Sequence, residues 1–122
     1  MSESDRRYDR YRLDEAAFKT VKLKRHGVMG LLSGYVDCKV KDMSKAGALV
    51  LCSSSVSLGS RISLKLELQN DSELVFLAEV VNLGRDVTKG LVKLGLRLEP
   101  SPEGSAEYRF LDSLAENYQK SF

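Results

Sequence analysis

The chain has 122 residues, of which 43% are hydrophobic and 30% charged, and this size and composition indicate one globular domain with a modest core. A formal net charge of +2 is too small to indicate nonspecific nucleic-acid binding, and no apolar run is long enough to cross a membrane. Cys38 and Cys52 could form one disulfide, but without a recognisable signal peptide we expect two reduced core thiols in a cytoplasmic protein.

Residues 1–14 are polar and rich in charge, which predicts a flexible N-terminal tail. Acidic residues are interleaved with the basic ones, so composition alone favours a solvated segment of mixed charge. The arginines of this tail are Arg6, Arg7, Arg10 and Arg12.

Residues 15–99 contain six segments in which apolar residues recur with the spacing of strands, separated by short stretches of turn chemistry. In the clearest segment, Arg61–Gln69, every second residue is apolar. A helix would distribute these apolar residues around its whole surface, whereas a strand places them on one face. Closely spaced strands of this kind predict a mostly β fold, a six-stranded antiparallel barrel, because closure removes exposed edges. The predicted strands are Phe18–Arg25, Tyr35–Val40, Ala48–Cys52, Arg61–Gln69, Leu74–Leu83 and Leu91–Leu98.

Residues 100–122 change to helical spacing, which predicts a C-terminal helix that packs on the barrel. Ser101 can cap this helix, with Pro102 at its first position. We expect its apolar stripe to cover one end or side of the barrel, with a dimer contact as the alternative. The stripe consists of Tyr108, Leu111, Leu114, Ala115, Tyr118 and Phe122.

Two short motifs stand out. The segment DMSKAG contains Asp42, Ser44 and Gly47 and joins two predicted strands. Its Asp and Ser can hydrogen-bond the backbone two residues on, and Gly47 can take a positive φ, so it is first of all a turn. The second motif is RRYDR, in which Arg6 and Arg10 stand four residues apart in the tail.

In this order the motifs resemble those of the PilZ domain, which has RxxxR before a small β-barrel and [D/N]xSxxG between two of its strands. The resemblance extends through the strand pattern to about Leu98. It implies a receptor for the bacterial second messenger cyclic di-GMP, with no cofactor and no metal. It also implies that the ligand orders the tail over the barrel and so signals to a downstream protein that controls motility, biofilm or exopolysaccharide.

The resemblance assigns ligand contacts to six residues. The arginine pair would use its planar guanidinium groups on phosphate oxygens or on guanine O6 and N7, with the neighbouring arginine as a helper. The aspartate would accept from guanine N–H groups, the serine would contact guanine or phosphate, and the glycine would keep the turn tight. In chain order these residues are Arg6, Arg7, Arg10, Asp42, Ser44 and Gly47.

Two other kinds of function remain open. A PilZ-like module could act through protein contacts without binding nucleotide, although members of that kind usually lack one or both motifs, which are intact here. A basic barrel could bind single-stranded nucleic acid through Tyr8 and Tyr11, but few other aromatic residues are available for stacking.

His26, the only histidine, lies beside Gly27, and nothing in the sequence suggests a base placed against a nucleophile, so we expect no enzyme. A monomer or weak dimer is expected.

Overall fold

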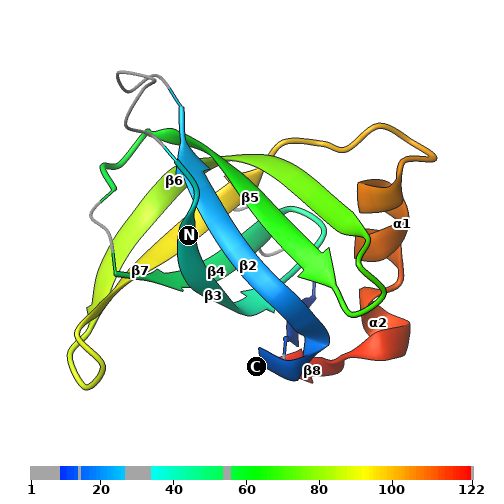
Figure 1. Cartoon of the computed structure of the whole chain (residues 1–122), viewed down its shortest axis with the longest axis horizontal. Coiled ribbons are helices and arrows are strands. Elements are labelled where there is room, and N and C mark those ends of the chain that lie inside the picture. Colours follow the sequence, from blue (N-terminus) through cyan, green and yellow to red (C-terminus); the bar gives the residue numbers. More distant parts are fainter. Residues whose placement is uncertain (1–8, 14, 27–33, 54–55, 122) are drawn as a thin grey trace.

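The computed structural model describes residues 9–13, 15–26, 34–53 and 56–121. Its eight strands form one antiparallel sheet in the order β2-β5-β6-β7-β4-β3-β1-β8, and pairing between β2 and β3 closes the six longer strands into a barrel (Figure 1). The strands are β1 (Arg10–Arg12), β2 (Phe18–Arg25), β3 (Val36–Met43), β4 (Gly47–Cys52), β5 (Arg61–Leu68), β6 (Glu73–Asp86), β7 (Leu91–Leu98) and β8 (Gln119–Ser121). The helices are a 3-10 turn η2 (Glu15–Ala17), α1 (Ala106–Asp112) and α2 (Leu114–Asn117).

The predicted six-stranded barrel is therefore confirmed, and alternation is the reason why it could be predicted. In β5 the inward-facing residues Ile62, Leu64 and Leu66 are 1%, 0% and 0% exposed. Strands β2 and β7 have the predicted bounds, whereas β6 runs to Asp86, through the first residues of the predicted loop. Together with β7 it forms a long hairpin that projects beyond the barrel (Figure 1).

The predicted flexible tail is wrong for Arg10–Arg12, which form strand β1. This strand forms beside the junction at which β2 and β3 close the barrel. Strand β2 pairs with β3 only at Lys22–Asp37 and Leu23–Val36, so the rest of that edge of β3 would be unpaired. Strand β1 pairs with this edge near Met43, and β8 pairs with the other side of β1. Residues 1–8 and 14 of the predicted tail lie outside the described residues.

The C-terminal helix begins later than predicted. Ser105, not Ser101, is the N-cap of α1, because its Oγ accepts a hydrogen bond from the Tyr108 amide at 3.1 Å. Gly104 immediately before the cap has φ 84°, which a helix interior does not allow. Ser113 is both the C-cap of α1 and the N-cap of α2.

The helices cover one side of the barrel, as predicted, but the stripe is only partly buried. Leu111 and Leu114 are 7% and 1% exposed. Phe110, which the stripe did not include, lies between the rings of Phe18, Phe76 and Tyr118 at centroid distances of 6.1, 6.3 and 6.2 Å. Of the remaining members, Tyr108 and Ala115 are exposed and Phe122 lies outside the described residues.

Candidate ligand-binding site

The turn between β3 and β4 is held by Ser44. Its amide donates to the Gly47 carbonyl at 2.8 Å, and its Oγ accepts from the amides of Ala46 and Gly47 at 3.2 and 3.0 Å. Ser44 is 0% exposed, so in this structure its hydroxyl is used inside the turn and not presented to solvent. The expectation of a positive φ at Gly47 is wrong, because the glycines with positive φ in the described part of the chain are Gly59, Gly90 and Gly104.

Strand β1 brings the two sequence motifs together. The Arg10 guanidinium donates to the Asp42 carboxylate at 2.7 Å, across 32 positions of sequence. The two side chains are 23% and 16% exposed, so the ion pair is only partly accessible to water. Arg6 and Arg7, the other predicted cationic contacts, lie outside the described residues.

Asp42 faces outward because of a β-bulge. Residues Val36, Cys38 and Val40 follow the inward alternation of β3, and uninterrupted alternation would turn Asp42 into the core as well. The register with β4 shifts between Val40 and Asp42, and Asp42 then lies opposite Leu49 on the outer surface.

A second bulge, on β6, turns Asn82 outward. Val80 faces the core, the register with β7 shifts between Val80 and Asn82, and Asn82 lies opposite Gly95. Gly95 is in turn opposite Leu49 of β4. The outer surface therefore carries one continuous row across β3, β4, β7 and β6, which consists of Asp42, Leu49, Gly95 and Asn82. We call these four residues the outer row.

The outer row lies in a cavity of about 460 Å³, within the size range of small-molecule sites. Arg10 and Lys93 provide its cationic side chains, and Asp42 its carboxylate. Leu49 and Leu83 contribute apolar surface, on which a flat base could lie. A second cavity of about 730 Å³ adjoins it, shares Asp42 and Leu49, and is lined by further basic residues, Arg12, Lys39, Lys41 and Lys89.

Sequence reasoning found Arg10 and Asp42 but missed Leu49, Asn82, Gly95 and Lys93. These residues belong to strands that were interpreted only as barrel wall. One signal was available, because Asn82 interrupts an apolar run in a strand whose buried face is otherwise hydrophobic. A polar residue at such a position indicates a functional group or a bulge, and in this structure a bulge turns Asn82 outward into the cavity lining.

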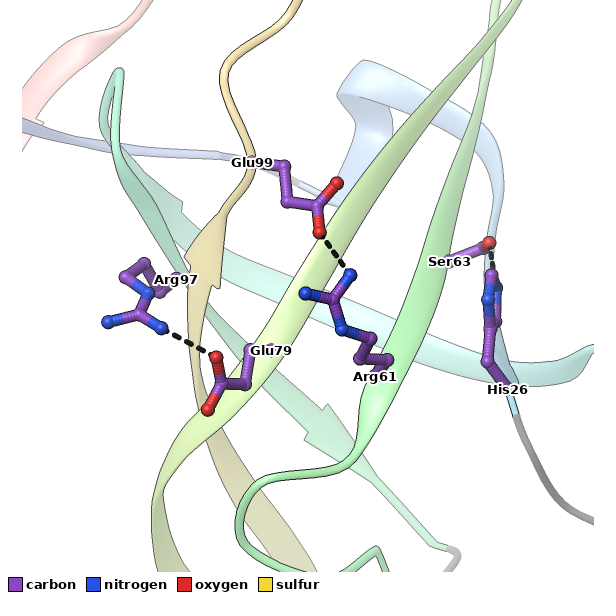
Figure 2. A network of polar contacts seen from close by, with 6 residues as sticks. All are labelled: His26, Arg61, Ser63, Glu79, Arg97 and Glu99. Carbon is purple, nitrogen blue, oxygen red and sulfur yellow. Dashed lines mark hydrogen bonds and ion pairs between the residues drawn. The ribbon is translucent and has the colours of Figure 1, made fainter.

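Another part of the outer surface is already neutralised by its own ion pairs. Figure 2 shows Arg97 paired with Glu79 at 2.5 Å and Arg61 paired with Glu99 at 2.6 Å. Glu79 lies between the two arginines in the sheet register. Neither Arg61 nor Arg97 lines the cavity that contains the outer row.

Figure 2 also shows His26 against Ser63, with Nε2 and Oγ 2.5 Å apart. Neither the motifs nor the strand pattern predicted this contact. Ser63 is 5% exposed, and no carboxylate within the described part of the chain hydrogen-bonds the His26 ring to orient it. The pair thus lacks the third group and the accessible hydroxyl of a nucleophilic site, and we interpret it as a contact between the end of β2 and β5.

The structure is a small closed β-barrel. Its candidate site lies on the outer surface, where Arg10 of β1 contacts Asp42 near the end of β3. The family model of the PilZ domain matches residues 4–113, so the chain belongs to the PilZ domain family, whose members are ligand-binding effector modules. Comparisons with curated proteins and with solved structures give no significant match. Over the described residues, no helix has the length and apolar character needed to cross a membrane.

Proposed function

We propose that this protein is a bacterial, cytoplasmic receptor for cyclic di-GMP and not an enzyme. The observation that carries the proposal is the contact between Arg10 of the RxxxR motif and Asp42 of the DxSxxG motif at a cavity of ligand size. Family membership supports the same ligand class. The ligand carries two phosphates and two guanines, and the cavity offers cations, a carboxylate and apolar surface that match them.

Binding requires the Arg10–Asp42 ion pair to open. Because the pair is partly buried, both charged groups need new partners when it opens, and a ligand that supplies partners to both offsets the loss. Asp42 would then accept from guanine N–H groups, and Arg10 would turn to phosphate oxygens or to guanine O6 and N7. Arg6 would make the second arginine contact, and Arg7 would assist.

Ser44 and Gly47 have supporting parts in this proposal. Because the Ser44 hydroxyl accepts two backbone hydrogen bonds inside the turn, its effect on the ligand is to fix the position of Asp42. Gly47 donates one of those bonds and begins β4. Direct contact of Ser44 with the ligand would require the turn to open.

Signalling follows from the division of the site between two segments. Arg10 is already anchored by β1, so the segment that ligand would order is the part of the chain before it. A ligand held by Arg6, Arg10 and Asp42 would fix this segment across the barrel and create a surface for a downstream protein.

Calorimetric titration with cyclic di-GMP tests the function, with GMP and cyclic di-AMP as comparison ligands. We expect specific binding of cyclic di-GMP, and we expect Arg6→Ala, Arg10→Ala and Asp42→Ala each to weaken it roughly tenfold to a hundredfold, because ligand groups lose charged or guanine-reading partners. Arg97→Ala is the matched control, since this arginine also pairs with a carboxylate but lies outside the cavity. Absence of binding by the parent protein would instead favour a PilZ-like module that acts through protein contacts alone.

A further inference from the structure

Asn82 occupies the end of the outer row opposite to Asp42. Both residues follow a bulge, and each bulge turns outward a side chain that uninterrupted alternation would place in the core. Bulges recur beside functional sites because they redirect a side chain in this way. Two of them, on different strands and both beside one cavity, indicate that Asn82 is positioned for the same ligand as Asp42.

The Asn82 amide is available for a ligand. Asn82 is exposed, and within the described part of the chain its side chain makes no hydrogen bond. Its position is nevertheless restricted by Gly95, because a Cβ placed on Gly95 would lie 2.8 Å from the Asn82 Cβ, closer than such atoms approach. Glycine at position 95 therefore lets Asn82 lie close over β7 and keeps the middle of the row flat.

The row is too long for one base. Asp42 and Asn82 are separated by three strand spacings, or about 14 Å, since neighbouring strands are about 4.8 Å apart. Outward-facing side chains on a convex barrel diverge, so the two polar groups do not converge on a single purine. A ligand that contacts both must have two recognition ends, as a cyclic dinucleotide has.

We infer that Asn82 recognises the second base of the bound dinucleotide, while Asp42 recognises the first. This inference rests on the proposed function and adds a selectivity residue to it. A neutral amide suits a base edge better than a phosphate, for which Arg10 and Lys93 are present. Its Nδ2–H would donate to O6 or N7 of the second guanine, with the base lying over Leu49 and Gly95.

The test compares two ligands that differ only at one base, cyclic di-GMP and the hybrid 3′,3′-cyclic GMP–AMP, by calorimetry. Asn82→Ala should weaken cyclic di-GMP about tenfold, as expected for a lost hydrogen bond with an unpaired acceptor. Asn82→Asp removes the donor and sets a carboxylate against O6 and N7, but the carboxylate can accept from the N6 amine of adenine. The affinity ratio of cyclic di-GMP to the hybrid should therefore fall at least tenfold in Asn82→Asp.

Asn70→Asp is the matched control, because it makes the same chemical change at an exposed turn outside the cavity and retains the acceptor that caps Ser72. It should leave both affinities and their ratio unchanged. If the parent protein binds cyclic di-GMP but Asn82→Asp weakens both ligands equally or neither, Asn82 does not recognise a base and the inference fails while the proposed function stands. If the parent protein binds neither ligand, both fail.

Discussion

At the scale of single residues, the site depends on side chains whose direction the alternation pattern does not predict. Asp42 and Asn82 both fall at positions that continue an inward-facing series, after Val40 and Val80. Sequence reasoning identified Asp42 because a motif marks it, and missed Asn82 because no motif does. The bulges that turn both residues outward depend on strand pairing between distant segments, which local sequence does not specify.

The prediction at this scale concerns Gly95. An alanine at Gly95 would bring its Cβ to 2.8 Å from the Asn82 Cβ, so β6 or the Asn82 side chain must move. We expect Gly95→Ala to weaken cyclic di-GMP at least tenfold and to destabilise the barrel by roughly 1–3 kcal/mol, the usual cost of an overpacked site. Calorimetry and urea denaturation measure the two effects.

Gly34→Ala is the control for this prediction, because a Cβ there meets nothing within 4 Å. At Gly84, which also lines the cavity, a Cβ would lie 3.7 Å from the Lys93 Cβ, an ordinary contact. Gly84→Ala should therefore leave the stability unchanged. Unchanged affinity and stability in Gly95→Ala would show that the close approach of β6 to β7 has no part in binding.

At the scale of elements, the long strands were predictable and the short ones were not. Six strands are long enough for alternation to show, and both β2 and β7 have the predicted bounds. Strands β1 and β8 have three residues each, too few for any period, and they form because β3 offers an edge that β2 leaves unpaired. The start of α1 was misplaced because two serines could serve as its cap.

The prediction at this scale is that β1 is ordered before ligand binds. Strand β1 has partners on both sides, and the Leu13 amide donates to the Lys41 carbonyl at 3.1 Å. Hydrogen exchange followed by mass spectrometry should thus show protection over residues 10–13 in the ligand-free protein. Deletion of residues 119–122 removes β8 and should reduce this protection, while that of β5 stays unchanged. Exchange of residues 10–13 at the rate of an unfolded chain would contradict the pairing.

At the scale of the whole molecule, burial in the folded barrel changes how Cys38 and Tyr118 titrate. Cys38 and Cys52 lie opposite each other across β3 and β4, and neither forms a disulfide. Burial, together with the charges of Cys52 and Asp37, raises the pKa of Cys38 from 9.0 to about 12. Burial also raises the pKa of Tyr118 at the C-terminal end of α2. Both groups therefore hold their protons more tightly in the folded than in the unfolded chain.

The last prediction is a loss of stability at alkaline pH that has Cys38 as a principal cause. A pKa that is higher in the folded state gives stability that is complete below the unfolded pKa, near 9, and is lost as the pH rises toward 12. The free energy of unfolding should fall in this window with a slope of up to about 1.4 kcal/mol per pH unit from this one proton. Urea denaturation at pH 8 and pH 10.5 measures the fall.

Cys38→Ser carries a hydroxyl that does not titrate, so its free energy of unfolding should fall less between these pH values than that of the parent protein, whatever its stability at pH 8. Tyr118→Phe tests the second group in the same way. If Cys38→Ser and the parent lose the same free energy between the two pH values, the Cys38 thiol is not held protonated by the barrel, and the loss must come from groups elsewhere in the fold.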